Sequence, residues 1–441
     1  KYKDFSAEYG TDKVGLMTGD IVINPQAKIL IMTTEIYRNM VVSSDSDIEN
    51  IAYVIFDEIH YINDIERGYV WEESIIYSSS EVRFLCLSAT IPYAQEFSNW
   101  ITAIKKHTVQ TITATTRTVP LKHLFYDYEL GITTLEQIRD AKKIPHYNTV
   151  FRKKNQKERI KVPEPNHVEL IKELGKEKLP CLFFSFSRND CQVKARELAK
   201  KQLLPRNSKI IELFNSYLQN APVDIAKLRS TMILKETLSQ GIAFHHAGLL
   251  PIIKEAIEDL FGKGLINVLY TTETFAVGIN MPAKTVCFNS LRKYDGISFR
   301  YLNTKEYFQI AGRAGRRGID TIGYVISMVF RPTFTYQEYQ RITAKDTEPI
   351  KSQFKLSTNT VLNLIQQHTK EEIEKILRLS FYSYQKYGNN YDKIPSKVLL
   401  SRYDSIVRRL KKLNYIADGR LTTKGIFSSR IFADEITMGE I

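Results

Sequence analysis

The sequence has no long apolar run and few cysteines, and its first ten residues, KYKDFSAEYG, do not resemble a signal peptide. No hydrophobic stretch approaches the roughly 20 residues that a membrane-spanning helix needs. The four cysteines (Cys86, Cys181, Cys191 and Cys287) are too few for a disulfide framework and too widely spaced for a zinc ribbon. We therefore expect an intracellular protein that makes no membrane contact, cytoplasmic or, if the source is eukaryotic, nuclear.

A more specific absence concerns phosphate binding. None of the 441 residues belongs to a G-x-x-x-x-G-K-[ST] loop, the pattern whose backbone amides and lysine hold the phosphates of a nucleotide. The paired histidines do not indicate a metal centre either. His245 and His246 follow an apolar stretch, but no second cluster of histidine, cysteine or aspartate at ligand spacing accompanies them.

Positive charge is in excess. Lysine and arginine number 62 against 49 aspartate and glutamate residues, a formal net charge of +13. This favours a polyanionic partner such as nucleic acid, although many basic proteins bind none. A hydrophobic content of 43% and a charged content of 25% are ordinary for a soluble globular protein, and the length suffices for two or three domains.

Strand-like and helix-like segments alternate in two separate regions. In residues 1–130 and again in residues 179–335, short apolar runs such as YVIF and CLFFSF alternate with amphipathic stretches. This alternation predicts an α/β fold with a parallel sheet in each region. The polar, basic residues 131–178 are predicted to form a linker, and residues 336–392 and 393–441 are predicted to be mainly helical.

Polar side chains follow two of the predicted strands. Asp57 and Glu58 come directly after YVIF, and Ser88 and Thr90 end VRFLCL. Because the carboxyl ends of parallel strands meet at one edge of a sheet, we expect these side chains to lie together. There an aspartate can hold Mg²⁺ and a glutamate can orient or deprotonate a water. Taken alone, the two acids could equally begin a turn, and the serine could be a helix cap.

An arginine-rich segment, QIAGRAGRRG, runs from Gln309 to Gly318. Its glycines let the backbone pack closely, while Arg313, Arg316 and Arg317 offer planar, permanently charged donors suited to nucleotide phosphates. On a continuous helix, Gln309 would share a face with the first two arginines. A solvated basic loop, or contact with nucleic-acid phosphates, would explain the same residues. TTETFAVGIN, farther upstream, indicates by itself only a capped helix.

In their order and separations these segments resemble those of superfamily-two DExH helicases, above all the superkiller and exosome-cofactor group of RNA helicases. The resemblance covers most of residues 11–330 and is carried by GLMTGD, TTEIYRNM, VIFDEIHYINDIERGYVWEE, LSATIPYAQEFSNWI, FSFSRNDC, HHAGLLPIIKEAIEDLF, TTETFAVGINMPAKTV and YFQIAGRAGRRGID. It implies two RecA-like motor domains, the first of them partial. A winged-helix-like connection (336–392) and the start of a helical ratchet domain (393–441) would follow.

The resemblance also implies ATP and Mg²⁺ as cofactors, and RNA, single-stranded or duplex with a tail, as the partner. In the nucleotide site, magnesium would lie at Asp57 and Glu58, with the catalytic set completed by His60, Gln309, Arg313 and Arg316. The arginines would act as fingers across the interdomain cleft. Coupling residues would be Ser88, Ala89 and Thr90, and further nucleotide contacts would come from Gly278 and Asn280. Nucleic-acid contacts would be Thr18, Gly19, Asp20, Thr34, Glu35, Arg38, Ser187, Arg188 and Thr272.

Members of this group carry their phosphate loop ahead of GLMTGD, and here only fourteen residues precede Gly15. We therefore expect hydrolysis to be very slow unless a missing N-terminal motor segment is supplied, in cis or as a separate chain. A fragment, a split gene and a degenerate pseudo-enzyme would each explain this. Two other functions stay open: a DNA helicase of the same superfamily, and a non-catalytic RNA-binding scaffold.

Overall fold

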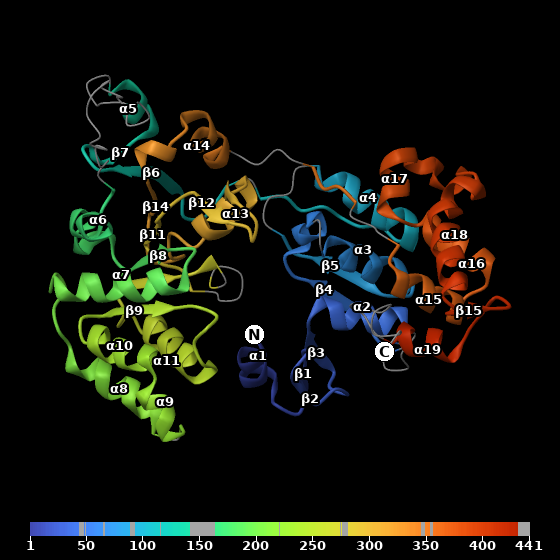
Figure 1. Cartoon of the computed structure of the whole chain (residues 1–441), viewed down its shortest axis with the longest axis horizontal. Coiled ribbons are helices and arrows are strands. Elements are labelled where there is room, and N and C mark those ends of the chain that lie inside the picture. Colours follow the sequence, from blue (N-terminus) through green and yellow to red (C-terminus); the bar gives the residue numbers. More distant parts are fainter. Residues whose placement is uncertain are drawn as a thin grey trace. The chain divides into compact units, whose positions relative to one another are not determined.

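In the computed structural model the chain forms two compact units (Figure 1). The first comprises Lys1–Thr113 and Thr347–Ile441, and the second comprises Ala114–Asp346. The structure describes residues 1–43, 48, 50–64, 67–88, 93–114, 116–141, 164–219, 221–273, 275, 281–344, 349–352 and 356–430. In this described part of the chain, no helix combines the length and the apolar character needed to cross a membrane.

The N-terminal part of the first unit alternates short strands with helices. Its elements are α1(Tyr2–Tyr9), β1(Val14–Met17), β2(Val22–Ile23), β3(Ile29–Met32), α2(Thr34–Val42), β4(Tyr53–Phe56), the 3₁₀ helix η2(Ile59–Asn63), α3(Gly68–Tyr77), β5(Arg83–Cys86) and α4(Ala94–Lys105). One sheet has the order β2-β1-β3, and β4 pairs with β5 in a parallel two-stranded sheet. Because side chains alternate along a strand, Val54, Phe56, Phe84 and Cys86 all face the core built by α2, α3 and α4.

Residues 356–430 form a helical module of the first unit. Its elements are α15(Thr358–Gln367), α16(Lys370–Arg378), α17(Phe381–Tyr387), the 3₁₀ segment η5(Gly388–Lys393), α18(Ser396–Lys412), the hairpin β15(Ile416–Ala417) and β16(Arg420–Leu421), and α19(Thr423–Ser429). The module has its own apolar cluster, which includes Val361, Leu377 and Tyr403. Phe381 packs instead on Trp100 of α4, whose indole N–H donates to the carbonyl of Leu379 at 2.8 Å. These contacts fasten the module to the α/β part of the unit.

The second unit is built on one seven-stranded sheet with the order β7-β6-β14-β11-β8-β10-β9. All of its neighbouring strands are parallel except β7, which is antiparallel to β6. The strands are β6(Leu121–Asp127), β7(Gly131–Thr133), β8(Cys181–Phe184), β9(Ile242–His245), β10(Val268–Thr271), β11(Thr285–Phe288) and β14(Gly323–Met328). A separate hairpin consists of β12(Arg292–Tyr294) and β13(Phe299–Tyr301).

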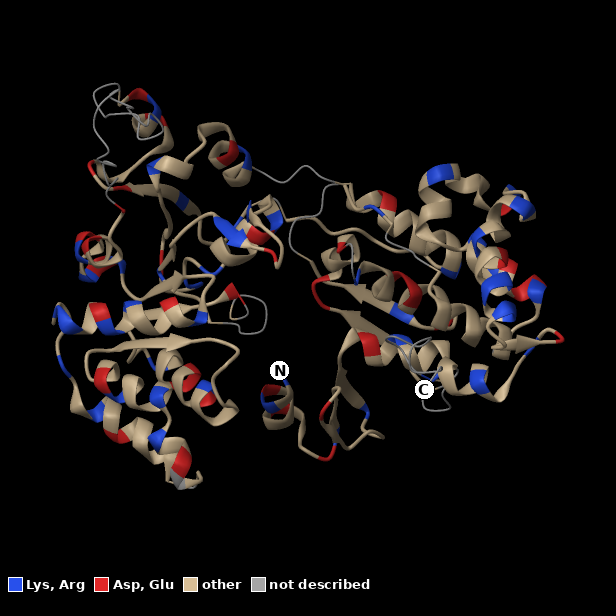
Figure 2. Ribbon diagram, in the orientation of Figure 1, with Lys and Arg blue, Asp and Glu red and all other residues tan. Residues whose placement is uncertain are grey.

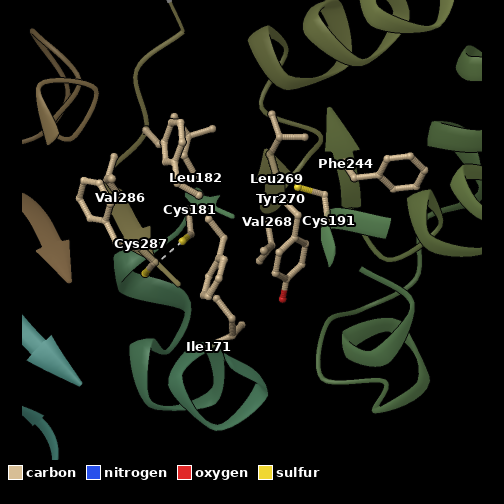
Figure 3. Close-up of a cluster of buried hydrophobic side chains, with 14 of the residues drawn as sticks. Ile171, Cys181, Leu182, Cys191, Phe244, Val268, Leu269, Tyr270, Val286 and Cys287 are labelled. Atoms are coloured by element: carbon tan, nitrogen blue, oxygen red, sulfur yellow. Dashed lines mark hydrogen bonds between the residues drawn. The ribbon is translucent and has the colours of Figure 1, made fainter. Parts of the chain in front are cut away.

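Helices and short 3₁₀ segments complete the second unit. They are α5(Leu135–Asp140), α6(His167–Leu174), η3(Lys176–Lys178), α7(Arg188–Lys200), α8(Ser208–Leu218), α9(Val223–Lys227), α10(Arg229–Leu238), α11(Pro251–Gly262), α13(Thr304–Ala311), η4(Arg331–Thr333) and α14(Tyr336–Thr343). The central strands are buried on both faces, as expected for a parallel sheet covered by helices. Figure 3 shows their side chains, with the thiols of Cys181 and Cys287 on adjacent strands, 3.6 Å apart. The predicted α/β class is therefore confirmed.

The predicted domain boundaries need correction. We expected residues 1–130 to form the first domain, but β6 pairs in parallel with β14 and so belongs to the second unit. The predicted linker 131–178 contains β7, α5 and α6, and the last of these packs into the core of the second unit. Helix α14 also lies in the second unit. Alternating strands and helices predict a parallel sheet, but they do not tell which sheet a strand joins.

Candidate functional site

The first group of polar residues lies at the carboxyl ends of β4 and β5. Asp57 and Glu58 follow β4, and the main chain here is held by Leu87, whose N–H donates to Phe56 at 2.8 Å and whose carbonyl accepts from Ile59 at 2.9 Å. Glu58 adopts the left-handed region, with φ 55°, which turns the chain sharply out of the strand. The two carboxylates therefore stand at the edge of the sheet where we expected them.

His60 joins Glu58 to the end of the neighbouring strand. Its Nδ1 lies 3.3 Å from a carboxylate oxygen of Glu58 and 3.3 Å from the hydroxyl of Ser88, which follows β5. The His60 ring stacks on Tyr61, with 4.9 Å between ring centroids. The structure thus brings together three of the predicted residues, as the parallel pairing of β4 and β5 requires. The predicted residues Ala89 and Thr90 lie outside the described residues.

The Asp57 carboxylate can accept a cation. Its side chain is 47% exposed, and it forms an ion pair with the ammonium group of Lys1. Among the described residues there is no group of three or more histidine, cysteine, aspartate or glutamate side chains placed to hold a metal ion. Carboxylate oxygens with open surroundings nevertheless suit Mg²⁺, which takes one or two protein carboxylates and completes its shell with water and phosphate oxygens. Asp57 and Glu58 fit such an ion.

The arginine-rich segment of the second unit is a helix end followed by a tight loop. Gln309 lies on α13, which begins with a capping box between Asn303 and Glu306 and ends at Ala311. Because the helix stops before Arg313, our expectation that Gln309 and the arginines share one helical face is wrong. Gly312 caps the end of the helix, and the segment that follows is held by tertiary contacts.

Arg117 provides several of these contacts. Its guanidinium donates to the carbonyls of Gly312 at 2.6 Å and of Ala314 at 2.7 Å. Gly315 has a φ of +81°, and a Cβ there would come within 2.5 Å of a methyl group of Val119. Glycine is therefore required at this point of the loop. The sequence analysis did not identify Arg117, since nothing marks its pairing with a segment almost 200 residues away.

Arg316 makes a bidentate ion pair within the loop. Its Nε and a terminal nitrogen lie 2.8 and 2.9 Å from the two carboxylate oxygens of Asp320, which also accepts from the Arg316 backbone N–H. The Asp320 side chain is only 3% exposed. The hydrogen bond from Arg316 is the main cause that lowers the pKa of Asp320. Asp320 therefore fixes the direction of the Arg316 guanidinium, and it was absent from our predicted site.

The predicted nucleic-acid contacts of the first unit fall into two groups. Gly19 and Asp20 are exposed in the turn between β1 and β2, where the Thr18 hydroxyl accepts from the Ile21 N–H at 3.1 Å. Thr34 is the first residue of α2. Glu35, in the same turn of that helix, forms an ion pair with Arg67. Gly19 and Asp20 are thus exposed, whereas Thr34 and Glu35 are partly buried.

Arg38 departs from its prediction. It is 5% exposed, its Nε donates to a Glu73 oxygen at 2.5 Å, and a terminal nitrogen donates to the Thr360 hydroxyl at 3.2 Å. Our expectation that Arg38 contacts nucleic acid is therefore contradicted, because its guanidinium is enclosed by protein acceptors. The arginine lies on the face of α2 that packs against α3 and α15.

Two of the three predicted nucleic-acid residues of the second unit line one cavity. Ser187 caps α7, and Arg188 and Thr272 line a cavity of about 390 Å³ together with Lys293, Tyr294 and Arg300 of the β12–β13 hairpin. Arg188 is exposed, whereas Thr272 is buried at 9% exposure. The structure thus brings two predicted residues together and adds hairpin residues that the sequence analysis missed.

Lys293 is the centre of an ion-pair network beside this cavity. Its ammonium lies 2.8 Å from Glu273, which follows Thr272, and 2.8 Å from Glu306 at the start of α13. Arg300 also pairs with Glu306, at 2.7 Å. Burial opposes ionisation of Glu306, but hydrogen bonds from Arg300 and Lys293 outweigh it and hold its pKa at about 2. The network ties the loop after β10 to the helix that carries Gln309. The predicted Gly278 and Asn280 lie outside the described residues.

A parallel sheet with acids at its carboxyl edge, and a loop rich in glycine and arginine, are features typical of nucleotide-dependent helicases. Known families agree: the DEAD/DEAH box helicase family matches residues 2–98, and the helicase conserved C-terminal domain family matches residues 193–318. The chain belongs to the superfamily-two DExH-box helicases and groups with their exosome and superkiller RNA helicase branch.

Three relatives illustrate this branch. The mouse exosome RNA helicase MTR4 is 40% identical over 410 residues, which are 88% of this chain and 38% of the relative. The human superkiller complex protein 2 is 38% identical over 411 residues, 86% of this chain and 32% of the relative. The Arabidopsis thaliana DExH-box ATP-dependent RNA helicase DExH9 is 37% identical over 413 residues, 87% of this chain and 41% of the relative. The chain thus spans about two fifths, or less, of the length of these relatives.

Proposed function

We propose that the protein is an ATP-dependent RNA helicase, which couples ATP hydrolysis to movement along RNA and to its unwinding during RNA processing or decay. The observation that carries this proposal is the group formed by Glu58, His60 and Ser88 beside Asp57, at the carboxyl edge of a parallel sheet. Relatives named as exosome and superkiller RNA helicases support RNA as the substrate.

In this proposal each residue of the first unit has one task. Asp57 holds Mg²⁺, which when bound with ATP neutralises phosphate charge and polarises the bond to be broken. Glu58 orients the attacking water and accepts its proton. His60 contacts both Glu58 and Ser88 at 3.3 Å, so a displacement of the segment after β5 alters the position of the Glu58 carboxylate. This contact is the proposed route by which the nucleotide state affects neighbouring segments.

In the second unit, Gln309, Arg313 and Arg316 provide donors for phosphate charge that develops during hydrolysis. Asp320 orients Arg316 through two hydrogen bonds, and the same pairing keeps the guanidinium from other acceptors until a phosphate competes for it. Arg188 and Thr272 contact the RNA backbone at the cavity beside the hairpin. Such backbone contacts carry little sequence information, in keeping with a motor that must move along any RNA.

The test is Glu58→Gln in the full-length protein. ATP hydrolysis stimulated by RNA should fall by at least about 100-fold, because the water loses its base, while RNA affinity should stay unchanged. Glu81→Gln, which changes an exposed glutamate near the start of β5, is the control for loss of one charge. Unchanged hydrolysis in Glu58→Gln would refute the site. Stimulation by DNA as strong as by RNA would refute the substrate.

A further inference from the structure

Helix α18 has one exposed face that is strongly basic. Its 17 residues include six lysines and arginines and a single acid, Asp404. All six cations are exposed, namely Lys397, Arg402, Arg408, Arg409, Lys411 and Lys412. The opposite face carries Leu400, Tyr403 and Leu410, which are buried in the apolar cluster of the helical module. At a rise of 1.5 Å per residue, the six cations extend over about 22 Å of the helix, from Lys397 to Lys412.

These charges are not balanced within the described part of the chain. There, none of the six forms an ion pair with a carboxylate, and the Arg408 side chain donates only to a backbone carbonyl, that of Asp404, at 3.3 Å. Helix α16 of the same module provides the contrast. It has three bases and three acids, and Arg378 forms an ion pair with Glu374. Acids and bases balance on α16, as is typical of a solvated surface. On α18 the like charges repel one another.

The helix dipole explains only part of this pattern. Cations in the last turn of a helix are stabilised by its negative end, which accounts for Arg409, Lys411 and Lys412. Lys397 lies in the first turn, where the dipole disfavours a cation, and Arg402 is more than two turns from the C-terminus. In Figure 2, several blue segments, which mark lysine and arginine, lie along the helices of this module. A polyanion that ran parallel to the helix would relieve their repulsion.

The hairpin β15–β16 is fixed at the end of this helix. Tyr415 is fully buried, and its N–H donates to the carbonyl of Leu410 at 2.9 Å. The hairpin turns at Asp418 and Gly419, both with positive φ, and places the exposed Arg420 directly after the turn. A basic helix followed by a rigid hairpin is an arrangement that suits a nucleic-acid backbone, since the helix and the hairpin can contact phosphates at separate points.

We propose that the exposed face of α18 binds the phosphodiester backbone of RNA, as a contact separate from the cavity lined by Arg188 and Thr272. The choice of RNA rests on the proposed function, whereas the phosphate chemistry rests on the six cations. Electrostatic binding of this kind has no sequence preference and weakens steeply with salt, because each contact releases condensed counterions.

The experiment compares two triple variants of the full-length protein with the same change of charge. The first is Arg402→Gln, Arg409→Gln and Lys412→Gln, on the α18 face. The control is Lys200→Gln, Lys201→Gln and Lys209→Gln, which removes three exposed cations of the second unit. Affinity for a labelled single strand and for a labelled RNA duplex is measured between about 50 and 200 mM salt. Thermal unfolding of both variants shows whether the fold is retained.

The α18 variant should bind at least about ten-fold more weakly than the control, and the slope of log affinity against log salt should become about two units less steep. A loss seen with only one of the two RNA forms would identify that form as the ligand. Equal slopes in the parent and the α18 variant, or equal losses in the two variants, would overturn the proposal. Hydrolysis stimulated by RNA, measured in parallel, tests the proposed function separately: its absence in the parent would refute that function and leave the comparison of affinities valid.

Discussion

The guanidinium of Arg38 and the carboxylate of Glu73 form a buried ion pair, with 2.5 Å between Nε and the nearer oxygen. Neither side chain is more than 6% exposed. The hydroxyl of Thr360 donates to the other Glu73 oxygen at 3.1 Å and accepts from Arg38 at 3.2 Å. Three elements that are distant in the sequence, α2, α3 and α15, thus meet at one pair of charges. The pair joins the helical module to the α/β part of the first unit.

Loss of this pair should destabilise the first unit. In Arg38→Met the Glu73 carboxylate stays buried without its partner, which should lower the free energy of unfolding by about 3 kcal/mol. Arg196→Met removes an exposed ion pair with Glu236 and should cost less than about 1 kcal/mol, so it is the matched control. Chemical denaturation measures both values. Similar losses in the two variants would contradict the structural role assigned to Arg38.

Glu72 should make stability depend on pH. Burial raises its pKa to about 7, even though Ser352 and the Phe381 N–H donate to its carboxylate. A carboxyl with a raised pKa binds its proton more tightly in the folded state. Its stabilising contribution is therefore complete below the pKa of the unfolded chain, about 4.5, and is lost as the pH rises through about 7.

The Glu72→Gln variant isolates this effect, since glutamine keeps the hydrogen-bond acceptor but does not ionise. Relative to this variant, the parent protein should lose about 3 kcal/mol of stability between pH 4.5 and pH 7, and little more above that. Denaturant titrations of both proteins at several pH values give the difference, in which all other titrating groups cancel. A difference that does not change with pH would show that Glu72 titrates normally.

Lys293 should couple RNA binding to hydrolysis. Removal of its ammonium in Lys293→Met takes one ion pair from Glu273 and one from Glu306, which keeps its ion pair with Arg300. The loop after β10 and the start of α13 then lose their shared anchor. Stimulation of hydrolysis by RNA should fall about ten-fold. Lys293→Arg, which keeps the charge, should restore most of it. If methionine and arginine variants behave alike, the network has only a packing role.

Substitution of Arg316 should slow ATP hydrolysis much more than substitution of Asp320. Arg316→Ala removes a donor to the phosphates and should lower the turnover at saturating RNA by about 1,000-fold, while RNA affinity is kept. Asp320→Asn leaves the arginine in place but loosens its direction and should cost only about ten-fold. Steady-state kinetics at saturating RNA separate the two. An equal loss of turnover and RNA affinity in Arg316→Ala would instead indicate a contact with the RNA backbone.

The sequence correctly predicted features that depend on neighbours along the chain. An apolar run followed by Asp57 and Glu58 indicated a buried strand with acids at its end, and a second run indicated Ser88 at the same edge. Parallel pairing then makes their proximity geometrically necessary, and His60 lies 3.3 Å from both Glu58 and Ser88. The α/β class followed in the same way from alternation of strands and helices.

Features that depend on distant pairing were missed or misassigned. Arg38 was expected to face nucleic acid, because its motif does not reveal which side of α2 meets Glu73 and Thr360. Arg117 was overlooked for the same reason, since its acceptors are carbonyls of a loop almost 200 residues away. The strand β6 was assigned to the first domain, although its hydrogen bonds go to β14.

The sequence by itself determined the local chemistry of this protein: which strands are buried, where acids, hydroxyl groups and arginines follow them, and the family to which the chain belongs. Tertiary structure alone decided which charged side chains are buried in ion pairs and which are exposed and able to bind a ligand. Burial and ion pairing depend on contacts between residues far apart in the chain, and a pattern of neighbouring residues does not contain that information. The charges of Arg38 and Arg402 look alike in sequence, but only the second is exposed.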